Sequence, residues 1–415
     1  MQPYDMKELE ERVILVGVQE SFSEDVEESL DELAELCETV GALVVGRVIQ
    51  NREKIHPGTY VGKGKIEEIA LLMEELGATG IVCDDELSPA QLNNLEKELD
   101  CKVMDRTLII LDIFAARANT SEGNIQVELA QLRYRAARLV GLRNSLSRLG
   151  GGIGTRGPGE KKLEMDRRLI HARISQLKAE LAQVQKHREL IRSKRKKDQM
   201  VVAAIVGYTN AGKSTLLNTL TDAGVLEEDK LFATLDPTTR LLELPGGQNI
   251  LLTDTVGFIR KLPHHLIEAF KSTLEEAKYA DIIIHVVDAS NPQKEKQMHV
   301  VYETLKDLGV KDQPILTLFN KQDRIENPEI LKDMKADKTL KISAKTGQGL
   351  DNLKDELEKI LRARSILLER VFPYEKAGLI QIVRAKGQLL EEEYRGDGIY
   401  VKAFVPAEIY GKVAY

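Results

Sequence analysis

Residues 201–220 read VVAAIVGYTNAGKSTLLNTL, and this stretch decides the fold of the region around it. A β-branched apolar run leads into Gly207, and after four more residues come Gly212, Lys213 and Ser214, followed by a helical pattern. This order of strand, loop and helix predicts a phosphate-binding loop, whose backbone N–H groups cradle the β-phosphate of a nucleotide. By rough residue frequencies, chance supplies on the order of 0.015 such motifs in a chain of this length. We therefore expect Lys213 to reach the β- and γ-phosphates and the Ser214 hydroxyl to coordinate Mg²⁺.

Three further motifs follow in the order that a guanine-nucleotide site requires. The strand-like run NILLTDTVGF ends in Asp254, which we expect to hold magnesium through water, and in Gly257, whose amide is placed to sense the γ-phosphate. The run PILTLFNKQD ends at Asp323, whose carboxylate can accept hydrogen bonds from the N1–H and 2-amino groups of guanine, which adenine cannot offer. In LKISAKTGQGL, the backbone of residues 343–345 is expected to cap guanine O6. Together the motifs predict a GTP-binding domain and not a general ATPase.

The stretch LFATLDPTTR, which lies between the phosphate loop and the DTVG motif, is the expected first switch segment. Thr234 is its predicted Mg²⁺ ligand when the γ-phosphate is present, with Thr238 and Thr239 as alternatives. Phe258 follows the DTVG motif directly, at the position where many small GTPases have a Gln that orients the attacking water. Because a phenyl ring cannot hydrogen-bond water, we expect slow intrinsic hydrolysis, and the role of Phe258 itself stays open.

The predicted site combines residues from all of these segments. The predicted catalytic residues are Lys213, Thr234 and Gly257, and the predicted metal ligands are Ser214, Thr234 and, through water, Asp254. The predicted contacts to GTP are Gly207, Tyr208, Thr209, Asn210, Ala211, Gly212, Lys213, Ser214, Thr215, Phe232, Ala233, Thr234, Leu235, Asp236, Asp254, Thr255, Val256, Gly257, Asn320, Lys321, Gln322, Asp323, Ser343, Ala344 and Lys345.

Residues 1–118 are predicted to form an N-terminal α/β domain with a mainly parallel sheet. Strand-like runs such as RVILVGV, ALVVGRVI and GIVCDD alternate there with amphipathic helical stretches. Within this region, TYVGKGKIEEI places Gly62 and Gly64 just before a helix. We favour an ordinary turn at these glycines over a second phosphate site at the helix N-terminus.

Residues 119–198 are predicted to form a long antiparallel helical hairpin. Apolar residues recur at helical spacing on both sides of RLGGGIGTRGPGEK (148–161), in which six of the ten positions 150–159 are glycine. Between residues 121 and 197, 19 Lys and Arg stand against 7 Asp and Glu, a net charge of +12 in a chain whose net charge is −7. Acidic partners one helical turn away are few, so we interpret the hairpin as an RNA-binding element, with a solvated helix face as the alternative. The predicted RNA contacts are Arg148, Gly151, Gly152, Arg156, Lys161, Lys162, Lys194 and Arg195.

The composition indicates a helix-rich α/β multidomain protein. Charged residues make up 30% of the chain and aromatic residues 5%, and no apolar run approaches the ~20 residues of a membrane span. Three scattered cysteines are typical of reduced thiols, and the N-terminus lacks the apolar core of a signal peptide. We expect a cytoplasmic monomer with no membrane span. The GTP-binding domain is predicted at 199–364 and a small α+β domain at 365–415.

Several phrases of the sequence resemble the HflX family of ribosome-associated GTPases. They are DRTLIILDIFAARANTSEGNIQVELAQLRY, RLGGGIGTRGPGEKKLEMDRR and FATLDPTTR, together with the nucleotide motifs, and the resemblance covers essentially the whole chain. It implies binding to the 50S subunit and the 70S ribosome, with the hairpin contacting 23S rRNA near the peptidyl transferase centre. It also implies GTP hydrolysis that the ribosome stimulates, and the splitting or rescue of stalled or idle 70S ribosomes under stress. The alternative is an RNA-binding assembly factor or chaperone of the large subunit, whose release is timed by GTP hydrolysis.

Overall fold

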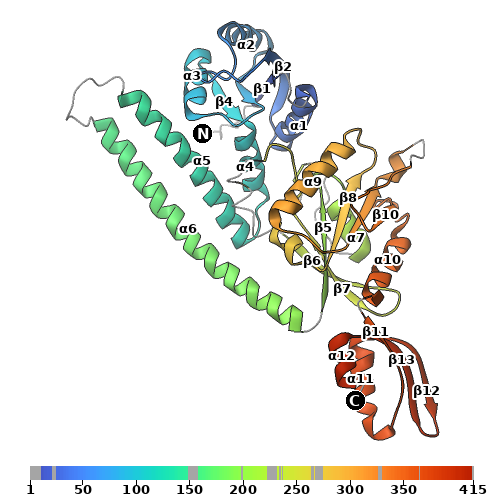
Figure 1. Ribbon diagram of the computed structural model, residues 1–415. Helices are drawn as coiled ribbons and strands as arrows, with labels where there is room; N and C mark the ends of the chain where they lie inside the picture. Colours follow the sequence, from blue (N-terminus) through green and yellow to red (C-terminus); the bar gives the residue numbers. More distant parts are fainter. Residues whose placement is uncertain are drawn as a thin grey trace, which may run out of the picture. The chain divides into compact units, whose positions relative to one another are not determined.

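The structure is a computed structural model that describes residues 11–20, 25–147, 158–197, 200–221, 231–232, 235, 237–262, 266, 274–325, 330–363 and 365–413 (Figure 1). The chain divides into two compact units. The first comprises Met1–Ile191, Glu228–Asp236 and Ile259–Thr273, and the second comprises Arg192–Glu227, Pro237–Phe258 and Leu274–Tyr415. Within the described ranges, no helix combines the length and the apolar character needed to cross a membrane.

The first unit contains a four-stranded parallel sheet in the order β2-β1-β3-β4. The strands are β1 (Arg12–Glu20), β2 (Leu43–Arg52), β3 (Gly80–Cys83) and β4 (Lys102–Asp105). They alternate with α1 (Val26–Thr39), α2 (Lys63–Leu76), α3 (Pro89–Leu99) and α4 (Arg106–Arg117), as the sequence predicts.

Gly62 precedes α2 as its N-cap. Its amide donates to Gln50 Oε1 at 2.9 Å, and its carbonyl accepts the amides of Lys65 and Ile66. The Gly62 amide therefore already has a partner from β2, and the contacts are those of a turn that starts a helix. This arrangement favours the interpretation of GKGK as a turn.

All three cysteines lie in the described part of the first unit and are free thiols. Cys37 and Cys83 are fully buried, and Cys101 is partly exposed. Burial raises the pKa of Cys37 to about 12 and that of Cys101 to about 11, and it raises the pKa of Cys83 as well. Cys37 and Cys83 are core side chains, and the partly buried Cys101 packs against the core.

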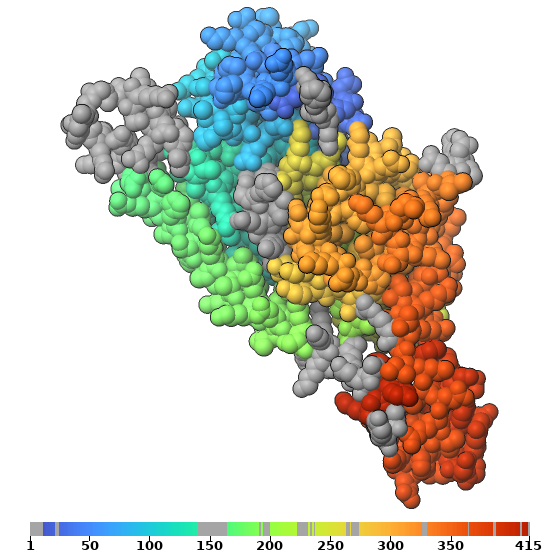
Figure 2. All heavy atoms as spheres, in the orientation of Figure 1, coloured from blue at the N-terminus to red at the C-terminus, as the bar shows by residue number. Residues whose placement is uncertain are grey.

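Two long helices, α5 (Ser121–Ser147) and α6 (Pro158–Lys197), form the predicted antiparallel hairpin (Figure 1). Their 27 and 40 residues correspond to lengths of roughly 40 and 60 Å at 1.5 Å per residue. An apolar seam of Leu129, Ile174 and Leu177 joins them. A bidentate ion pair from Arg173 to Glu128, at 2.7 and 2.8 Å, lies beside the seam. Met165, Leu169 and Leu190 of α6, the helix drawn in green in Figure 2, are exposed.

One buried carboxylate, that of Asp105, attaches α5 to the N-terminal sheet. Asp105 ends β4, is fully buried, and accepts the amides of Leu87 and Leu108 at 3.0 and 2.9 Å. It also accepts the Tyr134 hydroxyl at 2.8 Å and the Arg138 guanidinium at 2.5 Å, both from α5. Burial and the neighbouring Asp105 raise the pKa of Tyr134, so its hydroxyl stays a proton donor. A single side chain thus caps α4, fixes a loop and positions a hairpin helix.

The second unit contains a six-stranded sheet in the order β10-β9-β8-β5-β7-β6. Its strands are β5 (Val201–Gly207), β6 (Thr238–Glu243), β7 (Asn249–Asp254), β8 (Ile282–Asp288), β9 (Ile315–Asn320) and β10 (Lys338–Lys341). All neighbours are parallel except β6 and β7. The helices α7 (Lys213–Thr221), α9 (Lys294–Leu308) and α10 (Leu350–Ala363) accompany the sheet, with the 3₁₀ turn η1 (Gln322–Arg324) after β9. The carboxyl ends of the parallel strands meet at one edge, where open α/β sheets bind ligands.

The C-terminal part of this unit is a three-stranded antiparallel sheet in the order β11-β13-β12. It is built from β11 (Ser365–Phe372), β12 (Gln388–Arg395) and β13 (Gly398–Pro406), with η2 (Tyr374–Lys376), α11 (Ala377–Lys386) and α12 (Ala407–Val413). The helix α11 and the hairpin of β12 and β13, which turns at RGDG, fit the small α+β domain that the sequence predicts. The sequence prediction missed β11, because its run SILLERVF does not alternate cleanly between apolar and polar residues.

Replacing Asp105 with Ala should destabilise the attachment of α5. Two amides, a hydroxyl and a guanidinium would lose their common acceptor, and breaking a buried pair in this way costs roughly 3–5 kcal/mol. Hydrogen exchange of the α4 amides, followed by mass spectrometry on the full chain, should show that much loss of protection. The exposed Asp307→Ala is the matched control. Unchanged protection of α4 in Asp105→Ala would show that the carboxylate does not stabilise this region.

Candidate guanine-nucleotide site

The phosphate loop has a backbone conformation that only glycine accommodates at two positions. Gly207 and Gly212 have φ values of +156° and +94°. A Cβ at Gly207 would lie 2.3 Å from the carbonyl oxygen of Val286, and one at Gly212 would lie 2.3 Å from Asn320 Nδ2. Both glycines are therefore required by close packing as well as by backbone conformation. The loop then enters α7 at Lys213, so its amides and the helix N-terminus face the same point.

Lys213 is a buried cation at the start of α7. Its Nζ donates to the Tyr208 carbonyl at 2.8 Å, and only 6% of the residue is exposed. Burial lowers the pKa of Lys213 to about 8, with a smaller effect of Asp254 in the opposite direction. Near it, the buried Thr209 Oγ1 has no hydrogen-bond partner among the residues that the structure describes. A buried ammonium, a helix N-terminus and an unsatisfied hydroxyl suit an anionic ligand, so these residues fit a bound phosphate.

Two of the three predicted magnesium ligands lie together. Ser214 Oγ donates to Asp254 Oδ2 at 2.8 Å, which places a hydroxyl and a carboxylate oxygen at one point beside the phosphate loop. Oxygen donors of this kind are the ones that Mg²⁺ binds, so the pair fits the ion. Thr234 lies outside the described residues. Of the alternatives, Thr239 contacts Thr253 Oγ1 across β6 and β7 at 3.0 Å, and Thr238 pairs with Asp254 in the same ladder.

The base-recognition motifs are joined by the Asn320 side chain. Asn320 Nδ2 donates to the Ala211 carbonyl of the phosphate loop at 2.9 Å, and Asn320 Oδ1 accepts the Ala344 amide at 2.8 Å. Ser343 Oγ donates to Asp323 Oδ1 at 2.5 Å, and this hydrogen bond lowers the pKa of Asp323. The predicted segments around the phosphate loop, Asp323 and Ser343 therefore converge, with the Asp323 carboxylate charged and exposed.

Asp288 is a residue that the sequence interpretation missed. Its Oδ2 lies 2.7 Å from Lys321 Nζ, and its Oδ1 accepts both the amide and the hydroxyl of Ser290. Lys321 has a φ of +62°, in the left-handed region, and its ion pair holds the side chain at the sheet edge. The available signal was positional, because Asp288 ends an apolar strand as Asp254 does.

The backbone of Phe258 is paired with the phosphate loop. Its amide donates to the Gly207 carbonyl at 3.1 Å, and its carbonyl accepts the Thr209 amide at 2.8 Å. A Cβ at Gly257 would lie 2.9 Å from Thr209 Cα and 3.0 Å from Lys213 Nζ. The Phe258 ring is buried, so it packs inside the domain and offers nothing that could orient water. Of the nearby predicted contacts, Thr255 donates its hydroxyl to the Ile205 carbonyl at 2.8 Å.

Comparison with known proteins agrees with this geometry. The family models GTP-binding GTPase N-terminal, GTP-binding GTPase Middle Region and 50S ribosome-binding GTPase match residues 27–115, 117–195 and 202–321. A GTPase HflX of Lacrimispora saccharolytica is 69% identical over 410 residues, which cover 99% of this chain and 97% of that protein. The chain belongs to the HflX family of GTPases.

More distant relatives extend the comparison. The GTPase HflX of Escherichia coli K12 is 43% identical over 353 residues, 84% of this chain and 83% of that protein. The solved structure of a GTP-binding protein of Sulfolobus solfataricus in complex with GDP is 25% identical, with a TM-score of 0.45, and covers 84% of this chain and 98% of that one. The family membership and the phosphate-loop fold establish GTP hydrolysis as the activity of this HflX-family protein.

The remaining predicted site residues of this HflX-family GTPase are only partly described. Phe232 and Leu235 of the first switch segment are buried, whereas Ala233, Thr234 and Asp236 lie outside the described residues. The predicted RNA contacts Arg148, Gly151, Gly152 and Arg156 also lie outside them, and Lys161, Lys162, Lys194 and Arg195 are described as helical backbone only.

The charge of the hairpin is offset more than the sequence interpretation assumed. Acidic partners come from other elements instead of from one helical turn away. Arg188 pairs with Glu122 at 2.8 Å, and Arg192 pairs with Glu276 at 2.7 Å and stacks on the Tyr279 ring. These two arginines therefore stabilise the fold through contacts within the protein. Fewer cations of the hairpin than the sequence suggests are left to bind a polyanion.

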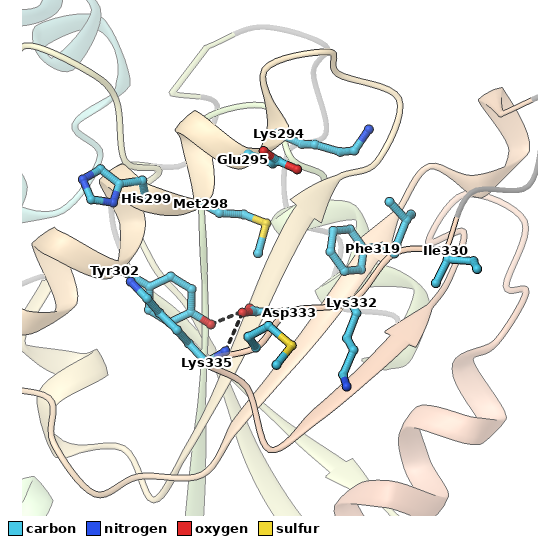
Figure 3. Close-up of a pocket in the computed structure, with 12 residues that line it drawn as sticks. Lys294, Glu295, Met298, His299, Tyr302, Phe319, Ile330, Lys332, Asp333 and Lys335 are labelled. Carbon is cyan, nitrogen blue, oxygen red and sulfur yellow. Dashed lines mark hydrogen bonds between the residues drawn. The ribbon is translucent and has the colours of Figure 1, made fainter.

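A cavity of about 350 Å³ lies beside α9, and no predicted nucleotide contact lines it. Figure 3 shows the Tyr302 hydroxyl pointing toward Asp333, and both residues line the cavity. The buried Asp333 accepts the hydroxyls of Tyr302 and Thr317, at 2.5 and 2.7 Å. Burial and the Asp333 hydrogen bond raise the pKa of Tyr302. These contacts fasten the loop of residues 330–335 to α9 and β9, and they form a structural network.

GTP binding should take up a proton at alkaline pH. With the pKa of Lys213 at about 8, the free protein holds a mostly charged ammonium at pH 7 and a mostly neutral amine at pH 9. A bound phosphate favours the charged form, so binding should take up roughly 0.9 proton at pH 9 and about 0.1 at pH 7. Affinity should therefore fall as pH rises through 8. Calorimetry in buffers of different ionisation enthalpy measures the uptake, and Lys213→Arg, which stays protonated, should show none.

Replacing Asp323 with Asn should change the base preference. The amide would offer a donor toward the donor groups of guanine, so GTP affinity should fall by roughly 100-fold or more, while xanthosine triphosphate should bind better. Competition binding with both nucleotides measures the ratio, and Asp351→Asn on α10 is the matched control. Full guanine preference in Asp323→Asn would mean that other residues recognise the base.

Proposed function

We propose that this HflX-family GTPase binds the large ribosomal subunit and uses GTP binding and hydrolysis to split or rescue 70S ribosomes. The observation that carries the proposal is the match of residues 202–321 to the 50S ribosome-binding GTPase family, joined in one chain to a long basic hairpin. A hairpin of this length gives reach, and its cations favour a phosphate-rich partner such as 23S rRNA. By resemblance to the family, its tip contacts rRNA near the peptidyl transferase centre.

At the nucleotide site, each residue has a part in hydrolysis. The phosphate-loop amides and Lys213 offset the charge of the β- and γ-phosphates. Ser214 and Asp254, with Thr234, would hold Mg²⁺, which when bound neutralises charge that develops on the phosphates. The Gly257 amide would hydrogen-bond a γ-phosphate oxygen and so report the nucleotide state.

The water that attacks the γ-phosphate lacks an orienting side chain at position 258. The Phe258 ring is buried and apolar, and its backbone is bonded to the phosphate loop. We therefore propose that intrinsic hydrolysis is slow and that the ribosome stimulates it by completing the arrangement around the water. Stimulation of this kind would restrict GTP turnover to the ribosome-bound protein.

RNA contact is proposed for the cations at and near the hairpin tip. Several arginines of the helices are occupied by ion pairs, namely Arg138, Arg173, Arg188 and Arg192. The contact is therefore assigned to Arg148, Arg156, Lys161 and Lys162, with Lys194 and Arg195 at the other end of α6. The glycines of the tip would let the backbone approach RNA closely.

The central experiment adds the purified protein and GTP to 70S ribosomes and separates the particles on a sucrose gradient. Free 30S and 50S subunits are the expected result. Replacing residues 151–158 with a short neutral connector should preserve GTP binding and abolish both splitting and stimulation of hydrolysis by 50S subunits. Binding to 50S subunits without any splitting would favour the assembly-factor alternative.

The salt dependence of 50S binding tests the electrostatic part separately. Lys161→Gln together with Lys162→Gln should reduce the slope of log K against log salt by roughly 1.5, because two phosphate contacts are lost. Lys354→Gln together with Lys359→Gln changes the net charge equally, but on α10, and should leave the slope unchanged. Equal slopes in both double variants would remove the hairpin lysines from the RNA contact.

A further inference from the structure

Asp288 ends β8 with a carboxylate whose two oxygens both have partners. Oδ1 accepts the amide of Ser290 at 3.0 Å and its hydroxyl at 2.6 Å, and Oδ2 lies 2.7 Å from Lys321 Nζ. Only 14% of the Asp288 side chain and 13% of the Lys321 side chain are exposed. All three residues belong to the second unit. The turn at Ser290 thus orients the carboxylate, and the carboxylate holds the lysine.

An ion pair that is this well buried has more influence than one on the surface. Exposed pairs contribute little because water screens their charges. Removing one partner of a buried pair instead leaves an uncompensated charge, which is costly. Without the charge of Asp288, the Lys321 ammonium would leave its place for the solvent. The position of the Lys321 side chain therefore depends on Asp288.

The backbone of Lys321 has a conformation that this ion pair helps to maintain. Its φ of +62° lies in the left-handed region, which is disfavoured for a residue with a Cβ. Such conformations persist where surrounding contacts over-determine them. The ion pair holds Lys321 by its side chain, and the next amide, that of Gln322, donates to the Ile342 carbonyl at 3.2 Å. Loss of the ion pair would remove one of these two restraints.

Lys321 also starts the turn that carries Asp323. It is the N-cap of η1, and its carbonyl accepts the Arg324 amide at 3.0 Å. Asp323 is the middle residue of η1, so the direction of its carboxylate follows from the backbone at Lys321. The hydrogen bond from Ser343 Oγ to Asp323 Oδ1 then forms where the turn places that oxygen. A series of contacts thus leads from the end of β8 to the carboxylate predicted to recognise the base.

The order of the strands gives Asp288 a central place in the site. β8 pairs with β5 on one side and with β9 on the other. The phosphate loop follows β5, and Asp323 follows β9. A nucleotide with its phosphates at the loop and its base at Asp323 must therefore cross the end of β8. Asp288 occupies the strand end between the phosphate-binding and base-binding parts of the site.

We propose that Asp288 is a positioning residue for base recognition. Through Lys321 it holds η1 so that the Asp323 carboxylate meets the N1–H and 2-amino groups of guanine together. Without the charge of Asp288 the left-handed backbone relaxes, and Asp323 no longer meets both donors. Guanine then loses more affinity than hypoxanthine, which has the N1–H group but lacks the 2-amino group. The proposal rests on the assignment of Asp323 to the base and is independent of ribosome binding.

The test measures the affinities of GDP and of inosine diphosphate, whose base is hypoxanthine, for full-length variants by calorimetry. In Asp288→Asn, which keeps an oxygen for the Ser290 amide, the preference for GDP should fall by roughly fivefold, because the displaced acceptor loses much of the hydrogen bond from the 2-amino group. Ser290→Ala removes a hydrogen bond to the same carboxylate but keeps the ion pair. This matched control should have the wild-type preference.

A double-mutant cycle separates positioning through Lys321 from a general structural effect. Lys321→Ala should lower the preference for GDP by a similar factor, and adding Asp288→Asn to it should cause no further fall. A further fall in the double variant would overturn the proposal, because Asp288 would then act without the lysine. An equal fall in Ser290→Ala would also overturn it, since the turn and not the ion pair would be responsible.

Asp323→Asn distinguishes failure of the proposal from failure of the site assignment on which it rests. This variant should abolish the preference for GDP over inosine diphosphate. If it does so while Asp288→Asn keeps the wild-type preference, Asp288 does not position the base-recognition carboxylate and the proposal is wrong. If neither variant changes the preference, the assignment of Asp323 to the base is wrong and the proposal fails with it.

Discussion

In each unit, one cation is buried at the carboxyl edge of a parallel sheet. The need to pair this buried charge is the constraint on which the structure of each unit depends. Arg106 follows β4 at the start of α4, and Lys213 follows the loop after β5 at the start of α7. Burying either charge is costly unless it is paired. The protein itself satisfies Arg106, through Asp84, Glu32 and the Ser29 carbonyl. Lys213 instead donates to a single described carbonyl, with Asp254 as the nearby anion.

This difference separates structure from function in two similar topologies. The fully paired arginine fixes the N-terminal domain and organises its acidic cluster. The lysine, whose pKa burial lowers, gains most from an anion that comes from outside the chain. Glycine at 207 and 212 permits the close backbone packing that surrounds it. The negative charge that Lys213 needs comes from the bound nucleotide, whereas the negative charge that Arg106 needs comes from side chains of the protein.

The sequence predicted those features that depend on local spacing. The phosphate loop, the Asp254 strand and the hairpin seam all follow from residue types at fixed intervals, and the structure contains each of them. Contacts between distant positions could not be predicted in this way. The Lys261–Asp84 pair spans 177 residues, and the four hydrogen bonds of Asp105 reach from Leu87 to Arg138. The partners of Arg188 and Arg192 were missed for the same reason, because a sequence pattern shows which element a residue belongs to but not which residues it contacts. The strand β11 was missed because its residues do not alternate cleanly between apolar and polar.

The burial of the three thiols has a consequence for chemistry in the cell. Oxidants and disulfide partners attack the thiolate, and burial raises the pKa of Cys37, Cys83 and Cys101, so that little thiolate forms at neutral pH. Two of the three sulfurs are also enclosed by the core of the N-terminal domain. Cys37 and Cys83 therefore present no accessible target to peroxide or to a shift in glutathione poise, and the raised pKa of the partly exposed Cys101 keeps its thiolate fraction small. All three cysteines lie in the N-terminal domain, so their oxidation would not remove any of the predicted contacts to GTP.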